Sequence, residues 1–277
     1  MKEELVNIKT KDGLLDCFVV CPDEGGPFNA AIIYMDAPAI REELRDMARR
    51  LASTGYLVIL PNLFYRVGKE GSYPFTFSKI REDKNHFHSM IKTMDDTTNE
   101  LVNDDSKYII EYLDNSKKVK GSSYGIIGYC MSGQYIVTVA ANYSDKICAA
   151  ASFYGVKILT ETQDSPHLLA NYISADLYLG FAQHDTWVDE EKLKNINKHF
   201  EKHTKKFRME VYQGTEHGFA FPDRHTYSKN AAEKHWSRIH VLFEKSLKNL
   251  KDEIERDMKL MGVTNVDQLS SNNLRFR

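Results

Sequence analysis

The sequence predicts an α/β fold with a mostly parallel central sheet and helices on both faces. Three observations favour it. The short runs 30–35 and 56–60 are almost continuously apolar, as expected of strands buried on both faces. Between them, Leu44, Met47 and Leu51 recur at the spacing of a helix. The links between these segments are short, which is typical of parallel strand–helix–strand units.

The same patterns predict the other elements in order. Residues 5–10 and 14–21 are predicted as two strands around the hairpin signal Lys-Asp-Gly. Later elements are strands at 125–128, 147–155, 176–182 and 207–212, and helices at 97–113, 134–141, 190–203 and 227–250. Residues 64–93 are irregular, with a charged part that is compatible with a helix. They either line a site at the sheet edge or form a plain surface excursion.

Composition narrows the class of protein. The chain has 277 residues, of which 42% are hydrophobic and 27% charged, so it can bury a large core. We predict a single domain at 1–250 and a charged, polar extension at 251–277. The formal net charge of -2 indicates no general attraction to nucleic acid or to anionic membranes.

The lack of a predicted targeting signal and the pattern of cysteines indicate the cytoplasm. The N-terminus is charged at once, and the sequence contains no run of 18 apolar residues, so neither secretion nor a membrane span is predicted. The four cysteines form no C-x-x-C pair and no zinc-ligand pattern. We therefore expect a reduced protein without a metal site. The sequence predicts no particular oligomeric state.

The stretch around Cys130 has the pattern G-x-C-x-S-G between a predicted strand and a predicted helix. A nucleophile on such a sharp turn has strained backbone angles, so its neighbours two positions away, here Gly128 and Ser132, must be small. The helix start exposes the backbone N–H of Met131 to a developing oxyanion and favours a thiolate. Ser132 is the weaker candidate nucleophile because Gln134 is too bulky for the turn. A buried structural thiol at Cys130 is the alternative.

Two further side chains follow predicted strands. Asp185 comes after the strand 176–182, and His217 comes after the last strand. The carboxyl ends of parallel strands share one edge of a sheet, so Cys130, Asp185 and His217 are expected in one crevice. Nucleophile, acid, histidine is also the chain order of the α/β-hydrolase triad. Alternatively, Asp185 caps the next helix, although Asp189 is better placed, and His217 is a surface histidine.

On these residues the chain resembles the dienelactone hydrolase (carboxymethylenebutenolidase) family of α/β-hydrolases over roughly 5–248. The resemblance rests on Tyr34-Met-Asp36-Ala-Pro, on the run from Gly55 to Arg66, on Gly128-Tyr-Cys130-Met-Ser132-Gly133, on His184-Asp185 and on Glu216-His217-Gly218-Phe219. It implies hydrolysis of a small ester or lactone without a cofactor by the triad Cys130–Asp185–His217. It also implies an oxyanion hole from the backbone N–H groups of Ala37 and Met131.

The resemblance implies a modulating carboxylate as well. Family members carry an acidic residue, usually glutamate, that contacts the resting cysteine, and Asp36 fills that place. A nearby carboxylate opposes thiolate formation, so it would keep the thiol quiet until substrate displaces it. Alternatively, Asp36 caps the following helix. Ser132 replaces a glycine that is usual in the turn.

Substrate-binding residues are less clearly marked. The family's arginine after the histidine is displaced, because Phe221 stands at its expected position and Arg224 lies three residues on. Arg66, Arg81 and Arg224 are the candidates to hold an anionic substrate, and each is otherwise a surface charge. The aromatic residues Trp187, Phe219 and Phe221 either wall an apolar pocket or belong to the core.

Four functions are therefore weighed. The first is a cysteine-dependent hydrolase of a small ester or lactone. The second is a thioesterase or acyltransferase with the same triad. The third is a catalytically silent α/β-hydrolase fold used for binding, which predicts a lost triad member, and none is lost. The fourth is a redox thiol, for which Cys130 lacks a neighbouring resolving cysteine.

Overall fold

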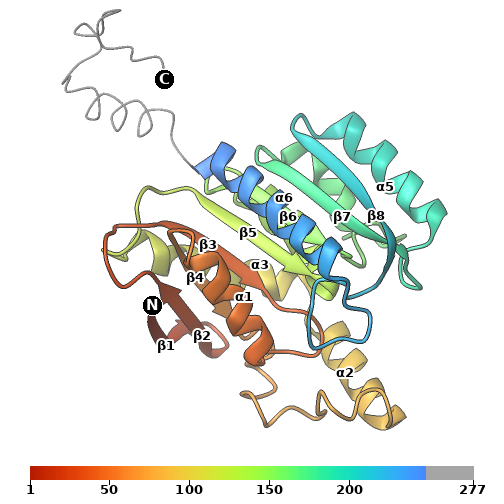
Figure 1. Ribbon diagram of the computed structural model, residues 1–277, viewed down its shortest axis with the longest axis horizontal. Coiled ribbons are helices and arrows are strands. Elements are labelled where there is room, and N and C mark those ends of the chain that lie inside the picture. Colours follow the sequence, from red (N-terminus) through yellow and green to blue (C-terminus); the bar gives the residue numbers. More distant parts are fainter. Residues whose placement is uncertain (248–277) are drawn as a thin grey trace, which may run out of the picture.

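A computed structural model of the chain describes residues 1–247. They form an eight-stranded sheet in the order β1-β2-β4-β3-β5-β6-β7-β8, with helices on both faces (Figure 1). The strands are β1 Lys2–Thr10, β2 Gly13–Cys21, β3 Asn29–Tyr34, β4 Tyr56–Pro61, β5 Tyr124–Tyr129, β6 Ile147–Phe153, β7 Asp176–His184 and β8 Phe207–Glu216. The α-helices are α1 Glu42–Ala52, α2 Lys84–Asp96, α3 Asn99–Asp114, α4 Gly133–Asn142, α5 Glu190–His203 and α6 Lys229–Leu247.

The sheet is parallel except at one end. The strands from β4 to β8 in the sheet order run parallel, whereas β2 pairs antiparallel with both β1 and β4. Helices α1 and α6 cover the face that is turned toward the viewer in Figure 1, and α3, α4 and α5 pack on the opposite side. The predicted α/β fold with a mostly parallel sheet is therefore confirmed.

Element boundaries differ from the predictions where local contacts decide them. Strand β8 continues past the predicted end at 212 to Glu216, because pairing with β7 resumes at His184 after a register shift. Helix α2 begins at Lys84, where the side chain of Asp83 accepts a hydrogen bond from the backbone N–H of Asn85 and caps the helix. The predicted extension at 251–277 lies outside the described residues.

The core lies between the sheet and its two helical layers. All residues of β4 and β5 are buried, which fits their almost continuous apolar sequence. Helix α6 approaches β5 so closely that a Cβ on Gly125 would lie 2.6 Å from the ring of Phe243. This close packing holds β5, and the turn that follows it, against the helical layer.

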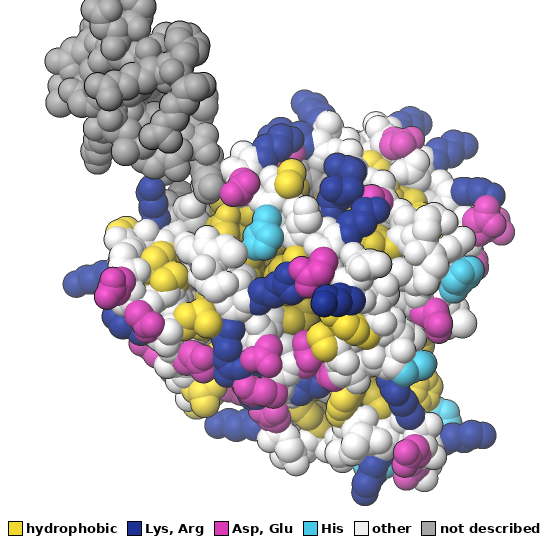
Figure 2. All heavy atoms as spheres, viewed as in Figure 1, with side chains coloured by type: hydrophobic (Ala, Val, Ile, Leu, Met, Phe, Trp, Pro, Cys, Tyr) yellow, Lys and Arg dark blue, Asp and Glu magenta, His cyan; other side chains and the backbone are white. Residues whose placement is uncertain are grey.

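The surface carries mixed charge. Figure 2 shows acidic and basic side chains intermingled over the viewed face, with hydrophobic side chains between them. Within residues 1–247, no helix has both the length and the apolar character that crossing a membrane requires.

Candidate active site

Cys130 occupies the sharp turn between β5 and α4. Its φ of 53° lies in the left-handed region, which non-glycine residues rarely adopt. A Cβ on Gly128 would lie 2.5 Å from Cγ1 of Ile136 and 3.0 Å from Cβ of Ser132. Only glycine fits at 128 without shifting α4, so the turn has the tight geometry that the sequence pattern predicts.

Two contacts fix this turn to neighbouring strands. Ser132 is fully buried, and its Oγ donates a hydrogen bond of 2.5 Å to the carbonyl oxygen of Met35, just after β3. The backbone N–H of Val156 donates to the carbonyl oxygen of Cys130 at 2.9 Å. Because the Ser132 hydroxyl is committed to the backbone, Cys130 is the side chain that the turn presents.

The other two predicted triad members lie together. Nδ1 of His217, just after β8, is 2.8 Å from Oδ2 of Asp185, just after β7. The other carboxylate oxygen of Asp185 accepts from the backbone N–H of Trp187. The alternative role of Asp185 as a helix cap is filled by Asp189, whose side chain accepts from the backbone N–H of Lys192.

The electrostatics couple His217 to the thiol. Burial disfavours the charged imidazolium, but the charge of Cys130 and the hydrogen bond to Asp185 outweigh it and raise the pKa of His217 to about 10. Nε2 of His217 is buried and makes no well-aligned hydrogen bond to a described residue. This nitrogen is therefore available to exchange a proton with Cys130 and with a reacting group.

A second charged group lies beside the triad at the end of β3. The carboxylate of Asp36 is fully buried and accepts from Nη1 of Arg41 at 2.6 Å and from Nη2 of Arg224 at 2.7 Å. Arg41 also donates to Asp223 at 2.6 Å. Burial alone would raise the pKa of Asp36, but the two arginines hold it below its usual range.

These contacts bear on the predicted role of Asp36. Both of its carboxylate oxygens are occupied by guanidinium groups, rather than by the thiol of Cys130. Although burial opposes its charge, Arg224 has a raised pKa because Asp36 and Cys130 attract it. Arg224 thus lies electrostatically between Asp36 and the thiol of Cys130.

A pocket of about 510 Å³ opens above Cys130 and His217. Of the other predicted residues, Ala37, Arg81, Trp187 and Arg224 line it. Met131 follows Cys130 at the start of the helical turn and is fully buried. The structure thus places Cys130 and His217 of the predicted triad, Ala37 of the predicted oxyanion hole and two of the three arginines around one pocket.

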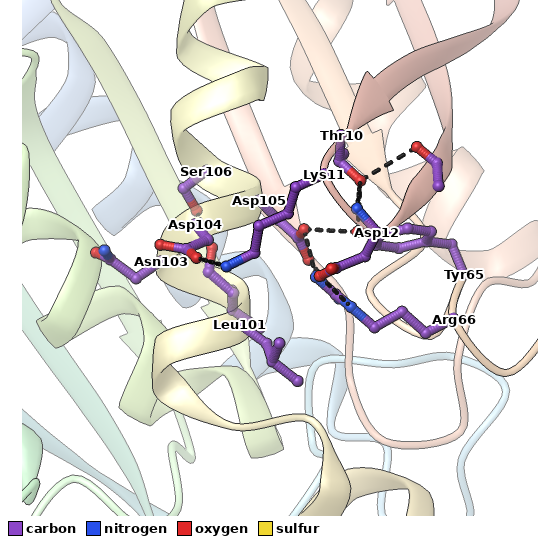
Figure 3. A network of polar contacts seen from close by, with 12 residues as sticks. Thr10, Lys11, Asp12, Tyr65, Arg66, Leu101, Asn103, Asp104, Asp105 and Ser106 are labelled. Atoms are coloured by element: carbon purple, nitrogen blue, oxygen red, sulfur yellow. Dashed lines mark hydrogen bonds and ion pairs between the residues drawn. The ribbon is translucent and has the colours of Figure 1, made fainter.

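Arg66 lies elsewhere. Its guanidinium bridges Asp12, in the β1–β2 turn, and Asp105 of α3 (Figure 3). The Asp105 carboxylate also accepts from the hydroxyl of Tyr65 at 2.8 Å. Its predicted role at the substrate therefore needs correction: Arg66 joins the edge hairpin to α3.

The aromatic predictions divide in the same way. Phe219 is fully buried, with its ring centroid 4.7 Å from that of Tyr212 and 5.2 Å from that of Tyr154. Phe221 is also fully buried, against the ring of Tyr129. Both belong to the core, because the turn after β8 folds them under the sheet edge, and only Trp187 of the three reaches the pocket.

Sequence reasoning did not identify two parts of the site. Tyr154 follows β6 with a φ of 40°, and its ring lies edge-on to His217 with centroids 5.0 Å apart. Its hydroxyl is buried without a hydrogen-bond partner among the described residues. The second part is the set of apolar side chains on the inner face of α2; of the two alternatives for segment 64–93, lining a site is the one that fits, because residues between Ile80 and Ile91 border the pocket. Its position after a strand would have pointed to Tyr154, and helical spacing of apolar residues would have pointed to α2.

Comparison with known proteins now decides the family. The model of the dienelactone hydrolase family matches residues 15–247. The chain belongs to the dienelactone hydrolase family. It is therefore a hydrolase with an α/β-hydrolase fold, in a family that acts on lactone and ester bonds. The resemblance drawn from the sequence is confirmed.

Individual relatives are distant but span nearly the whole chain. A Synechocystis protein assigned as a carboxymethylenebutenolidase is 26% identical over 251 residues, covering 90% of this chain and 98% of its own. A Bradyrhizobium protein assigned as a 2-oxo-3-(5-oxofuran-2-ylidene)propanoate lactonase is 22% identical and covers 84% of this chain and 90% of its own. A structure from Klebsiella pneumoniae assigned as a dienelactone hydrolase has a TM-score of 0.76 at 20% identity, covering 87% and 98%.

Proposed function

We propose that this chain hydrolyses a small ester or lactone through an acyl-enzyme formed on Cys130. The observation that carries the proposal is the convergence of a strained cysteine turn with the 2.8 Å His217–Asp185 pair at one edge of the sheet. It acts without a cofactor, in the cytoplasm, on a small-molecule substrate.

The first half-reaction uses the proton held by His217. The thiolate of Cys130 attacks the ester carbon, and the backbone N–H groups of Ala37 and Met131 stabilise the resulting oxyanion. His217 then donates its proton to the leaving alkoxide, and Asp185 stabilises the imidazolium and fixes its orientation. With a lactone, the released hydroxyl stays attached to the acyl group.

The second half-reaction clears the thioester. Neutral His217 removes a proton from water, which attacks the thioester carbon in the same oxyanion hole. Collapse of the tetrahedral intermediate releases the carboxylic acid, and the Cys130 thiolate is restored beside protonated His217. The high pKa of His217 favours its protonated form at neutral pH, so the proton needed by the leaving alkoxide is held at this imidazole.

Asp36 modulates the nucleophile through Arg224 in this mechanism. Arg224 is attracted by both Asp36 and Cys130, so Asp36 holds a positive charge beside the thiolate. A positive neighbour favours the thiolate, whereas a bare carboxylate would oppose it. Arg224 and Arg81 both line the pocket, and their guanidinium groups bind the substrate if it is anionic.

The test is release of p-nitrophenol from p-nitrophenyl acetate by wild type and by Cys130→Ala. We expect turnover in the wild type and loss of turnover in the variant. Cys148→Ala is the matched control, because Cys148 is a half-buried thiol in β6 outside the pocket. Equal rates in wild type and a folded Cys130→Ala, checked by circular dichroism, would reject the acyl-enzyme proposal.

A further inference from the structure

Helix α2 presents an apolar stripe to the active site. Phe87, Met90, Ile91 and Met94 line the pocket above Cys130. They are spaced at i, i+3, i+4 and i+7, so they share one face of the helix. Met90 and Met94 are only 6% and 3% exposed, whereas Phe87 at the mouth is 38% exposed.

The position of α2 explains why this stripe faces a cavity. Figure 1 shows α2 beyond the edge of the sheet where the parallel strands end, rather than over either face of the sheet. An amphipathic helix normally buries its apolar face against a sheet or another helix. Here the apolar face of α2 is turned toward the pocket that holds Cys130 and His217.

Part of the remaining lining continues this apolar wall, whereas Arg81, Lys84 and Arg224 add charged groups elsewhere around the pocket. Ile80 precedes α2 and Val156 follows β6, and both side chains reach the same pocket. Methionine side chains are unbranched and polarisable, so Met90 and Met94 can adapt to a flexible chain. A cavity of about 510 Å³ lies within the range of sites that enclose ligands much larger than an acetyl group.

We propose that this chain acts on esters that carry an extended apolar chain, which lies along the inner face of α2. This inference rests on the proposed function, because it places the chain next to a carbonyl held at Cys130. The apolar chain belongs either to the acyl group or to the alcohol of the ester. Its length is set by the stripe from Met94 to Phe87, which extends about 10 Å along the helix axis.

The test compares two series of esters. One contains p-nitrophenyl acetate, butyrate, hexanoate and octanoate, and the other contains ethyl, butyl, hexyl and octyl acetate. In one of the two series we expect kcat/KM to rise about fourfold per added methylene, the effect of burying one CH₂ group. The rise should level off when the chain reaches the mouth. The series that rises identifies the side of the ester that α2 binds.

Variants of α2 test whether this helix causes the rise of kcat/KM with chain length. Met90→Gln should reduce the increase to about twofold or less per methylene, because it places an amide in the apolar wall. Phe87→Ser, at an exposed position where folding is not at risk, should lower the rate of the longest ester most. Met209→Gln is the control, since Met209 lies on β8 beside a different hollow, and it should leave both series unchanged.

The outcomes separate this inference from the proposed function. If acetate esters are hydrolysed in a Cys130-dependent way but both series are flat or fall with length, the apolar-chain inference is overturned and the mechanism stands. If Cys130→Ala retains full acetate turnover, both fail. A rise with length that Met90→Gln and Phe87→Ser leave intact would also overturn the inference, because another surface would then bind the chain.

Discussion

The proposed triad and α2 meet at the same pocket and are positioned in different ways. Cys130, Asp185 and His217 each follow directly from a strand of the sheet, and close packing holds the turn at Gly128. Helix α2 is reached through an irregular segment after β4 and lies beyond the sheet edge (Figure 1). The sheet thus fixes the positions of the proposed catalytic residues. The segment that contains α2, which connects β4 to α3, sets the shape of the pocket.

This difference predicts how mutations divide. Changes near the strand ends should alter the rate of every substrate, or the stability of the fold, because these residues are held by the core. Changes on α2 should alter the ranking of substrates. A strand-end variant that changed only the ranking of substrates would contradict this division. So would an α2 variant that slowed every substrate equally.

The largest effect is expected at Asp185. Asp185→Asn keeps the shape but removes the charge that orients and stabilises the His217 imidazolium, so kcat should fall by about 10³- to 10⁴-fold for short and long esters alike. Steady-state kinetics on two esters measures it. Asp189→Asn is the matched control, since Asp189 caps α5, and its kcat should stay near the wild-type value.

The next effect is on stability, at Asp36. Asp36→Asn leaves Arg41 and Arg224 buried with one carboxylate fewer, and the free energy of unfolding should fall by about 3 kcal/mol. Urea unfolding followed by circular dichroism measures the loss. Asp12→Asn, which removes a partly exposed partner of Arg66, should cost less than about 1 kcal/mol. Equal losses would show that the buried group does not stabilise the strand end.

Acid should also lower the free energy of unfolding, because α6 carries a buried histidine. His235 of α6 is fully buried, its Nε2 is 3.0 Å from the hydroxyl of Tyr129 in β5, and burial lowers its pKa to about 3. Between pH 3 and 6.5 the unfolded chain therefore binds one more proton than the folded chain. The contribution of His235 to stability is fully present above pH 6.5 and should fall by about 2 kcal/mol by pH 5, whereas the raised pKa of His217 acts in the opposite direction over this range.

Urea unfolding from pH 7 to pH 5 tests this pH dependence. His235→Gln should reduce the slope, since it removes the titrating group. Some slope should remain, because burial also lowers the pKa of His167 and His199. A variant slope identical to that of wild type would assign the acid sensitivity to other groups.

The smallest effect is expected at Arg66. Its guanidinium is held by Asp12 and Asp105, so Arg66→Ala should change kcat/KM by less than about twofold on an anionic ester (Figure 3). Arg81→Ala, at the pocket, should weaken the same substrate more. A larger loss for Arg66→Ala than for Arg81→Ala would contradict the structural role of Arg66 and return it to the substrate site.

The sequence alone could predict that Cys130, Asp185 and His217 lie at one sheet edge, because the rule that parallel strands end at one edge needs only local patterns. It could not sort Arg66 from Arg224. Both are arginines in irregular segments, and their roles depend on partners far along the chain: Asp105 for one and Asp36 for the other. Asp36 was expected to contact the thiol; its bond to Arg224 joins residues 188 positions apart, which local patterns do not reveal.

The residues of the α2 stripe were not singled out for a related reason. The charged part of segment 64–93 was compatible with a helix, but periodicity does not tell whether an apolar face meets a core or a cavity. That distinction depends on the irregular path between β4 and α2. Phe219 shows the converse, because its place next to His217 suggested a pocket wall, and the turn buries it against Tyr212 instead.

The most direct test of the central claim is to trap the acyl-enzyme. Wild-type protein mixed with p-nitrophenyl hexanoate, quenched in acid within the first turnover and digested, should yield a hexanoylated peptide containing Cys130. A burst of p-nitrophenol equal to the enzyme concentration should accompany it if deacylation limits turnover. Steady hydrolysis with the acyl group on another residue, or with full rates in Cys130→Ser, would contradict the account.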